Sequence, residues 1–384
     1  MPEISDQKQH LYIGLMSGTS IDGVDVALVD FKENHCELLG AYLHPIASNV
    51  REALANIATP KIKGQNQTEN RIEELAELDV IMGKIFADSV NRALDKFSVS
   101  QKQILAIGSH GQTVRHRPDY NHPFTIQIGD PNIIAEKTGI SVVADFRRAD
   151  IAAGGQGAPL APAFHNAVLR SDIEDRIILN LGGIANITLL PKDKNQSVIG
   201  FDTGPANTLL DAWYLTHHPE STTSFDQNSL FAQQGIVNRP LLKLLLEDPY
   251  LQLKPPKSTG REYFSLDWLE GHINSFSENI PKQDIQRTLV EFTTVTIVNS
   301  IQNLSVENIK IYACGGGMHN SFLLNLLSEK LLTNVQTTNK LGVDGDYLEA
   351  MTFAWLAKQR IEKLPGNLPS VTGARKLKVL GAIY

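Results

Sequence analysis

The segment from Ser17 to Gly23, Ser-Gly-Thr-Ser-Ile-Asp-Gly, contains the residue types that can bind an anion. Its glycines leave backbone N–H groups accessible, and its hydroxyl groups are further donors. Apolar residues on both sides, within Leu11–Asp30, predict two strands joined by this turn. The segment is therefore a candidate phosphate-binding turn. An ordinary polar β-turn is the alternative, because short Gly-rich matches are common.

A second segment repeats this pattern. Apolar residues of Ile177–Leu190 flank Gly182-Gly183-Ile184-Ala185-Asn186, and a further predicted strand, Val198–Phe201, leads into Asp202 ahead of a helix that begins near Thr208. Two copies of one unit predict two similar domains that face each other across a cleft. Asp202 would lie at a strand end beside that cleft. That position would make it a candidate functional residue, and the alternative is an aspartate that only forms a turn or caps the following helix.

A third Gly-rich turn, Gly315-Gly316-Gly317, lies between a predicted strand, Ile309–Ala313, and a predicted helix. Such a turn lets a flat ring or a phosphate approach the backbone, and the helix N-terminus favours an anion. By contrast, Lys257-Ser258-Thr259-Gly260 lacks the upstream glycine of a P-loop, so the sequence contains no Walker A motif.

Three other polar segments are candidates for substrate contact. His110 to Thr113 is expected to form a loop after a short strand, Ile104–Ser109, where α/β proteins place chemistry. Arg147 and Arg148 lie between two aspartates. This pattern is typical either of a surface ion-pair network, which contributes little to stability, or of a polar surface that binds a charged or hydroxylated substrate. Glu349 begins a predicted helix, where interaction with the helix dipole is the alternative.

The Gly-rich run from Gly154 to Pro159 is no dinucleotide fingerprint, because Leu160 stands where the third glycine is needed. We interpret it as a close-packed crossing between domains. The first domain is then predicted to cover residues 1–148 and the second residues 149–364, with the tail, 365–384, a candidate to join the first.

Helical spacing of apolar residues predicts two long helices that support these segments, Thr68–Asp95 and Asp284–Leu304. At 384 residues the chain exceeds the roughly 250–300 residues at which single cores stop growing, which also predicts two domains. The first ten residues have no apolar core, and no apolar run reaches the ~18 residues of a membrane span. We therefore expect a cytoplasmic protein without membrane contact.

Charge and cysteine content exclude further classes. A net charge of −7 argues against a nucleic-acid partner. The two cysteines, Cys36 and Cys314, are too few for a disulfide scaffold or a thiolate zinc site.

Taken together, the three turns, strand–SGTSIDG–strand, strand–GGIANIT–strand and strand–CGGG–helix, resemble the first phosphate, second phosphate and adenosine motifs of the sugar kinase, Hsp70 and actin superfamily. More closely, the chain resembles anhydro-N-acetylmuramic acid kinases from about Tyr12 to its end. The blocks that carry this resemblance are MSGTSIDGVD, GSHGQTVRH, ADFRRADIAAGGQGAPLAP, NLGGIANIT, GFDTGPANTLLDAW, PKSTGREYF and CGGGMHN.

The resemblance implies an α/β fold with two RNase H-like domains of the actin, hexokinase and Hsp70 type around a nucleotide and substrate cleft. It implies ATP-dependent conversion of 1,6-anhydro-N-acetylmuramic acid and water to N-acetylmuramic acid 6-phosphate, in reuse of cell-wall material. The implied ATP-binding residues are Ser17, Gly18, Thr19, Ser20, Ile21, Asp22, Gly23, Val24, Gly182, Gly183, Gly315, Gly316 and Gly317.

The resemblance also assigns roles at the reacting atoms. Asp202 is implied as the base that activates water for attack on the anomeric carbon. Asp22 is the candidate for Mg²⁺, through water, with a turn aspartate as the alternative. Arg148 is suited to the lactyl carboxylate of the sugar. Glu349 is expected to orient the sugar or to assist the water. His110 and Gln112 are expected to contact the sugar, and structural or substrate-lining roles rather than catalytic ones are expected for His110 and His116.

Two functions of other classes compete with the kinase. An ATP-independent glycoside hydrolase would use Asp202 and Glu349 as its carboxylate pair and release a product without phosphate. A nucleotide-gated switch would bind ATP and leave sugars untouched, although the chaperones lack the GGQGAPLAP and GFDTGPAN blocks. The sequence itself does not give the oligomeric state. The resemblance implies that a homodimer can form, to which the insert Ser221–Pro281 could supply a contact.

Overall fold

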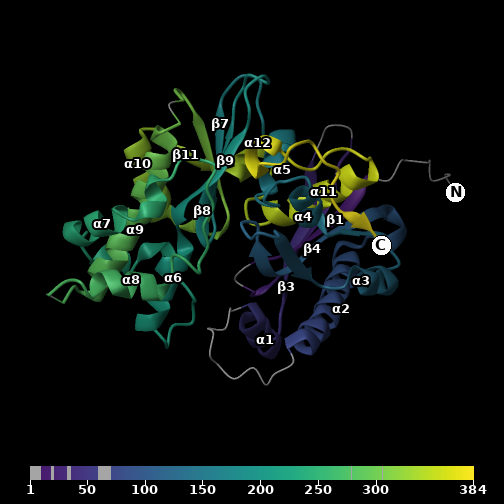
Figure 1. Ribbon diagram of the computed structural model, residues 1–384, viewed down its shortest axis with the longest axis horizontal. Coiled ribbons are helices and arrows are strands. Elements are labelled where there is room, and N and C mark those ends of the chain that lie inside the picture. Colours follow the sequence, from purple (N-terminus) through teal and green to yellow (C-terminus); the bar gives the residue numbers. More distant parts are fainter. Residues whose placement is uncertain (1–9, 19–20, 33–35, 59–70, 278, 305) are drawn as a thin grey trace. The chain divides into compact units, whose positions relative to one another are not determined.

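The computed structural model describes residues 10–18, 21–32, 36–58, 71–277, 279–304 and 306–384. The chain forms two compact units, one of Met1–Val168 with Tyr347–Tyr384 and one of Leu169–Asp346. Figure 1 shows both in colours that follow the sequence. This division differs from the sequence-based boundaries, because helices α4 (Phe146–Ala152), α5 (Ala161–Val168) and α11 (Leu348–Ile361) belong to the first unit.

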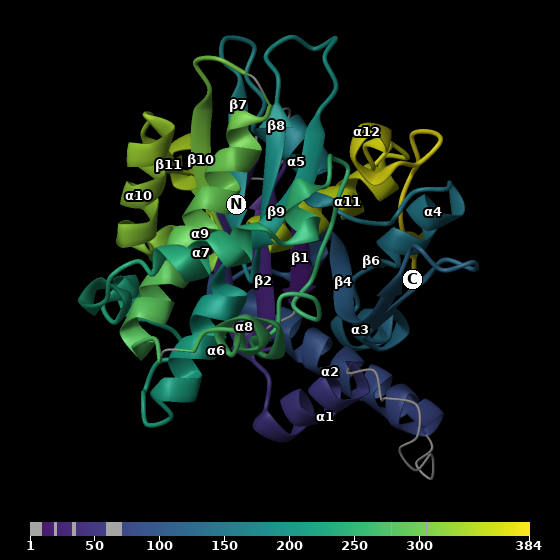
Figure 2. The same cartoon turned by 60° about the vertical axis from the view of Figure 1, so that its left-hand side comes forward.

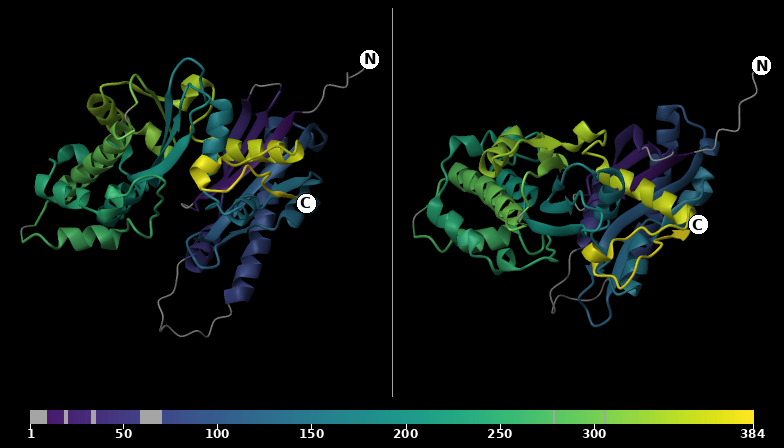
Figure 3. Two further views of the ribbon diagram at one scale, coloured as in Figure 1. Left: turned by 45° about the horizontal axis from the view of Figure 1, so that its top comes forward. Right: turned by 90° about the horizontal axis from the view of Figure 1, so that it is seen from above.

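Helix α11 packs directly on the first sheet. Gly14 and Gly108 face it from neighbouring strands, and a Cβ on either glycine would collide with the carbonyl oxygen of Ala350 or Phe353. The helix backbone therefore rests against the strand backbones. In both views of Figure 3 the yellow helix crosses the purple and blue strands of this unit.

The first sheet has the strand order β12-β6-β4-β1-β2-β3, with β5 paired to β4. β2 runs antiparallel to β1. β4 pairs with β1 in parallel, and β6 pairs with β4 in parallel. The strands are β1 (Leu11–Ser17), β2 (Gly23–Asp30), β3 (Glu37–Pro45), β4 (Ile104–Arg117), β5 (Phe124–Ile128), β6 (Val142–Ala144) and β12 (Ala382–Ile383). Besides the three helices named above, the unit contains α1 (Ser48–Ala58), α2 (Arg71–Phe97), α3 (Pro131–Thr138) and α12 (Pro369–Thr372).

The second sheet has the order β11-β10-β7-β8-β9, with β8 antiparallel to both of its neighbours and β7, β10 and β11 parallel. The strands are β7 (Arg176–Leu181), β8 (Ile184–Leu190), β9 (Ile199–Pro205), β10 (Lys310–Cys314) and β11 (Val335–Thr337). The helices are α6 (Asn207–His217), α7 (Arg239–Leu246), α8 (Leu266–Ile273), α9 (Lys282–Gln302) and α10 (Ser321–Leu331). Helix α9 packs along β9, as Figure 2 shows, and is buried over most of its length.

Counted along the chain, each unit places its central strands in the order 3-2-1-4-5 with only the second strand reversed. This is the topology of the RNase H-like fold, so the predicted α/β class with two such domains is confirmed. Each sheet has its own apolar core, as the alternating strand patterns predict. Large members are Ile13, Leu15, Met82, Phe86 and Ile107 in the first unit and Ile177, Leu179, Phe264, Phe292 and Leu323 in the second.

Two predicted elements are longer than their patterns indicated. The expected loop after Ser109 is part of β4, because residues 112–117 pair with β5 in an antiparallel hairpin. Gly111, at a φ of 77°, lets the strand change direction there. Likewise β9 extends through Pro205, so Asp202 lies within a strand, opposite Asn186 of β8.

The long helices predicted from apolar spacing are present as α2 and α9, shifted by a few residues. Thr68, where the first of them was expected to begin, lies outside the described residues. Among the helices of the described ranges, none is both long and apolar enough to cross a membrane.

Candidate active site

The first Gly-rich turn is braced by the strand beside it. The buried Ser17 hydroxyl lies 2.6 Å from Oε1 of Gln112 and 3.1 Å from the carbonyl oxygen of Gly23. Gln112 is the register partner of Ser17 on β4, and its Nε2 donates to the carbonyl of Gly18 at 3.3 Å. Gln112, predicted to contact the sugar, therefore holds the first two residues of this turn, and the Ser17 hydroxyl contacts its last residue, Gly23. Thr19 and Ser20 lie outside the described residues.

The same turn contains backbone strain. Ile21 has a φ of 56°, a conformation that is unfavourable for a β-branched residue, and its N–H donates to the carbonyl of Gly18 at 3.3 Å. Such strain costs about 1–3 kcal/mol and gathers at ligand-binding segments. Asp22 is exposed, while its carbonyl accepts the N–H of Ile46 at 3.3 Å. Val24, at the end of the segment, is buried in β2.

No cluster of three or more His, Cys, Asp or Glu side chains suited to a metal ion occurs within the described ranges. An exposed carboxylate beside a Gly-rich turn has the chemistry that Mg²⁺ takes as a ligand, because that ion binds oxygen atoms and keeps several of its waters. Asp22 has this placement.

The second Gly-rich turn is held by main-chain bonds. The N–H groups of Ala206 and Thr208 donate to the carbonyl of Gly183 at 2.9 and 3.0 Å, and the N–H of Asn207 donates to that of Gly182 at 3.1 Å. A Cβ on Gly183 would lie 2.6 Å from Oγ1 of Thr208. The start of α6 is thus tied to the turn, and a side chain at residue 183 would require the Thr208 hydroxyl to move.

The third turn leaves one residue accessible. Gly315 has a φ of 77° and donates its N–H to the carbonyl of Gly345 at 2.9 Å. A Cβ on Gly317 would lie 2.7 Å from Cβ of Leu181, whereas a Cβ on Gly316 would meet nothing within 4 Å. The outer glycines are required by the turn and its packing, and Gly316 presents open backbone to which a flat ring can be apposed.

Asp202 is fixed by a segment that is distant in sequence. Its Oδ2 accepts the N–H of Thr259 at 2.9 Å, and its own N–H donates to the carbonyl of Lys257 at 3.1 Å. The hydroxyl of Tyr250 donates to the Asp202 carbonyl at 2.8 Å. The segment that fails as a P-loop therefore positions this carboxylate. Tyr250 and Thr259 were missed by the sequence analysis, because nothing in their local pattern links them to β9.

The surroundings of Asp202 suit a base. Loss of hydration raises its pKa to about 6, against the opposing effects of the Thr259 N–H and the Lys257 ammonium group. The Lys257 ammonium lies 4.7 Å from the Tyr250 ring centroid and donates to the Tyr250 carbonyl at 3.3 Å. A carboxylate with this pKa is ionised at neutral pH and retains enough basicity to take a proton from water.

A polar cluster in the first unit joins three of the predicted segments. Nε of Arg147 donates to Nε2 of His110 at 2.9 Å, and Nη1 donates to the carbonyl of Gly157 at 2.8 Å. His110 accepts at Nε2, so its Nδ1 carries the proton and donates to the carbonyl of Gly111 at 2.9 Å. Burial and the charge of Arg147 hold the pKa of His110 well below its usual range. His110 is thus a neutral acceptor that orients an arginine.

Arg147 has the strongest electrostatic connections of this cluster. Loss of hydration lowers its pKa to about 10, and the charges of Glu349 and Asp150 partly offset that change. Loss of hydration raises the pKa of Glu349 and the Arg147 charge opposes the rise, although the glutamate keeps exposed surface in the first turn of α11. The structure therefore brings Glu349 and Arg147 together.

Arg148, predicted for the substrate carboxylate, has a different environment. Its Nε donates to Oδ1 of Asp145 at 2.7 Å, and its side chain is 66% exposed. His116, in contrast, is partly buried, with Nδ1 3.1 Å from Oγ1 of Thr125. Burial and the charge of Arg147 lower the pKa of His116 to about 4.

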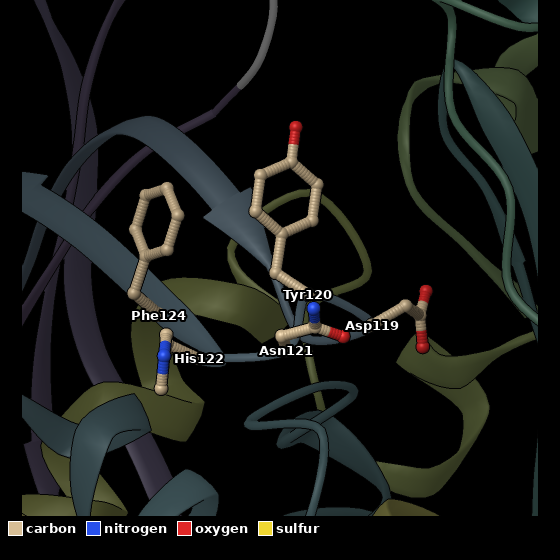
Figure 4. Close-up of a pocket in the computed structure, with 5 residues that line it drawn as sticks. All are labelled: Asp119, Tyr120, Asn121, His122 and Phe124. Atoms are coloured by element: carbon tan, nitrogen blue, oxygen red, sulfur yellow. The ribbon is translucent and has the colours of Figure 1, made fainter.

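An open hollow of about 540 Å³ lies at the tip of the β4–β5 hairpin (Figure 4). Its lining residues are Asp119, Tyr120, Asn121, His122 and Phe124. In Figure 4 the rings of Tyr120 and Phe124 point to the same side, with centroids 5.8 Å apart. None of the predicted site residues lines this hollow, so it does not mark the candidate site.

Comparison with known proteins decides the family. The family model described as anhydro-N-acetylmuramic acid kinase matches residues 10–384. The chain belongs to this family. An anhydro-N-acetylmuramic acid kinase of Coxiella burnetii (strain Dugway 5J108-111) is 50% identical over 376 residues, which are 97% of each chain. One of Xylella fastidiosa (strain Temecula1 / ATCC 700964) is 50% identical over 378 residues, 97% of this chain and 96% of that one.

Solved structures are less similar. The activator of the 2-hydroxyisocaproyl-CoA dehydratase from Clostridium difficile aligns with a TM-score of 0.40 and 13% identity, over 92% of this chain and 98% of that one. A likeness at this level supports no conclusion about activity. Membership of the anhydro-N-acetylmuramic acid kinase family makes the chain an enzyme of kinase type that uses ATP, which favours the kinase over the glycoside hydrolase.

Proposed function

We propose that this anhydro-N-acetylmuramic acid kinase family member converts 1,6-anhydro-N-acetylmuramic acid, water and ATP to N-acetylmuramic acid 6-phosphate, opening the anhydro bridge in the same reaction. The observation that carries the proposal is the Asp202 carboxylate, held within β9 opposite Asn186 of β8 by the Thr259 N–H, with its pKa raised to about 6. The pathway is recycling of cell-wall peptidoglycan.

Asp202 acts as the general base. An ionised carboxylate at this position accepts a proton from water as the water oxygen bonds to the anomeric carbon. The bond from that carbon to the bridging oxygen breaks, and the oxygen stays on carbon 6. The Thr259 N–H keeps one carboxylate oxygen oriented, so the other is available to the water. This geometry favours one face of the sugar for attack.

The oxygen released on carbon 6 then attacks the γ-phosphorus of ATP, and ADP leaves. Transfer of this kind is accelerated mainly by positioning and charge stabilisation. The residues from Ser17 to Val24 hold the β- and γ-phosphates, with Gly182 and Gly183 as the second phosphate contact and Gly315–Gly317 against the adenosine. Asp22 would hold Mg²⁺ through water, and the ion would supply positive charge to the phosphate oxygens.

Arg147 and Arg148 compete for the lactyl carboxylate of the sugar. The contacts favour Arg147, because His110 and Gly157 fix its Nε and Nη1, and no hydrogen bond from Nη2 is found among the described residues. A guanidinium held in this way presents Nη2 to a carboxylate at low entropic cost. Glu349 contacts the sugar hydroxyls from the start of α11.

An isotope experiment tests this function against the two rivals. The protein is incubated with the anhydro sugar, Mg²⁺ and ATP in oxygen-18 water, and the product is analysed by mass spectrometry and NMR. A kinase with coupled ring opening gives one product with heavy oxygen at the anomeric carbon and phosphate on carbon 6. Heavy oxygen without phosphate, or turnover without ATP, would identify a hydrolase. Nucleotide binding with unchanged sugar would identify a switch.

The cytoplasm is the proposed location, since both substrates are small soluble molecules and ATP is an intracellular metabolite. A homodimer with a contact from residues 221–281 also stays a prediction. Sedimentation equilibrium at micromolar concentration tests it, and a single monomer mass would contradict it.

A further inference from the structure

A fully buried carboxylate lies next to the cluster around Arg147 and has no part in the proposed chemistry. Asp150 is 0% exposed. Its Oδ2 accepts the N–H of Gly157 at 2.8 Å. Its Oδ1 accepts Nδ2 of Asn367 at 2.7 Å and the Thr372 hydroxyl at 2.9 Å. A buried charge is tolerated when hydrogen bonds replace its hydration, as three donors do here.

The donors to Oδ1 come from the C-terminal segment, residues 367–378. Asn367 and Thr372 are 2% and 1% exposed, and the N–H of Lys378 donates to Oδ1 of Asn367 at 2.7 Å. Main-chain bonds run beside these contacts, from the N–H of Gln156 to the Thr372 carbonyl at 2.8 Å and from the N–H of Arg375 to the Ala153 carbonyl at 3.0 Å. The tail is therefore hydrogen-bonded to the loop of residues 153–157, which was predicted from the sequence to be a crossing between domains.

The loop has no room to move independently of Asp150. A Cβ on Gly155 would collide with Oδ2 of Asp150, and a Cβ on Gly154 would lie 2.6 Å from Nη1 of Arg375. Gly157 has a φ of 71°, so its peptide groups have a fixed direction. Its N–H points to Asp150, and its carbonyl accepts from Nη1 of Arg147. A shift of the Asp150 carboxylate is thus passed to the guanidinium through one residue.

We infer that Asp150 is a positioning residue for Arg147, through which the C-terminal segment 367–378 sets the geometry at which the enzyme binds the carboxylate of its sugar. This inference rests on the proposed function for its substrate. Arg147 takes its position from two directions, from His110 on β4 and from Gly157 on the loop held by the tail. The tail carries no group that contacts the reacting atoms in this scheme. It reaches the loop that contains Gly157 through Asp150 and through the main-chain bonds of Gln156 and Arg375.

Thr372 offers the mildest test, because its hydroxyl can be removed with little change in volume. T372V loses the bond to Asp150, and T372S retains it. Thr138 provides a matched control: it is also buried in the first unit, with its hydroxyl 2.7 Å from the Ile134 carbonyl and accepting the Ile140 N–H at 3.3 Å. T138V therefore removes an equivalent hydroxyl away from the Arg147 cluster.

Kinetics of the full-length variants separate positioning from stability. T372V should raise the KM for the anhydro sugar about tenfold, because small displacements of a binding group cost this much or more, while the KM for ATP stays unchanged. T372S should restore the wild-type value within about twofold, and T138V should leave both KM values unchanged. Equal sugar KM values for T372V and T138V, or a parallel rise in the KM for ATP, would overturn the inference.

A second measurement does not depend on turnover. The Nε–H of Arg147, assigned by loss of its NMR signal in R147K, should exchange with solvent faster in T372V than in T138V, because its partner geometry is loosened. Equal exchange rates would again overturn the positioning role. If the wild-type protein does not phosphorylate the sugar, the proposed function fails, and this exchange measurement still decides the inference. D150N, which places an amide group at Asp150, should show a larger effect on both readouts if it folds.

Discussion

Asp202 in the second unit and Asp150 in the first are both shielded carboxylates, and they differ in how completely they are hydrogen-bonded. Asp150 accepts three hydrogen bonds, distributed over both oxygens, and has no exposed surface. Asp202 accepts one backbone N–H at Oδ2 and keeps part of its surface exposed. Both side chains are largely removed from water, but Asp150 accepts three hydrogen bonds and Asp202 accepts one.

The difference shows what separates a base from a support. Hydrogen-bond donors compensate a carboxylate for its lost hydration. Asp202 lacks that compensation, and its pKa rises to about 6. Proton transfer therefore requires a carboxylate that is incompletely satisfied, while positioning requires one that is saturated.

The largest expected effect comes from removing the base. D202N retains an oxygen that can accept the Thr259 N–H but cannot take a proton, so kcat should fall about a thousandfold, within the range that general bases contribute. Steady-state kinetics at saturating ATP and sugar measure this. Wild-type turnover by a well-folded D202N would show that Asp202 is not the general base.

The two adjacent arginines should differ next. R147K loses the planar fork that His110 and Gly157 hold, so the KM for the sugar should rise about thirtyfold. R148K changes an exposed pair with Asp145, which is worth little, and should alter that KM by no more than about twofold. Sugar titrations at saturating ATP compare the variants. A larger rise in the sugar KM for R148K than for R147K would show that Arg148 binds the carboxylate.

Lys257 should tune Asp202 without replacing it. Its positive charge lowers the pKa of Asp202, so K257M should raise that pKa. Activity needs the ionised carboxylate and is lost as the pH falls, so the acidic limb of log kcat/KM should move from near pH 6 to higher pH, by about half a unit. A pH profile from 5 to 9 measures the shift, and K257R is the charge-retaining control. Movement to lower pH would contradict the assignment.

The smallest effect is a gain in stability. The folded-state pKa of Asp202 is raised from 3.8 to about 6, so the stability linked to this group is present below pH 3.8 and is lost as the pH rises through 6. D202N avoids that loss and should exceed the wild type by on the order of 1 kcal/mol at pH 7.5, with the two converging near pH 4. Thermal denaturation at both pH values checks this. A destabilised D202N at pH 7.5 would show that Asp202 is held as firmly as Asp150.

The sequence predicted much of the fold, because hydrophobic periodicity and turn residues act locally. The β1–β2 and β7–β8 hairpins and helices α2 and α9 followed from such patterns. The continuation of β4 beyond Ser109 did not, since its polar residues pair with β5. Propensity alone favours a loop for such residues, and tertiary pairing overrides it.

The candidate site was predicted in its residue types and only partly in its connections. Asp202 was expected at a strand end and instead lies within β9, whereas the second Gly-rich turn joins β7 to β8 as expected. The contacts of Asp202 with Thr259 and of Asp150 with Thr372 join positions 57 and 222 residues apart. Such pairs leave no periodic signal in one chain. For the same reason the choice between Arg147 and Arg148 needed the position of Gly157.

The contact of helix α11 with Gly14 and Gly108 has a further consequence. With no side chain on either glycine, the sheet acts as a fixed stop that determines how deep the helix sits, and Glu349 is carried at that helix's first turn. Adding a single methyl group at either strand would lift the whole helix outward and move the glutamate with it. Gly14 and Gly108 therefore determine the position of the Glu349 side chain relative to the sheet.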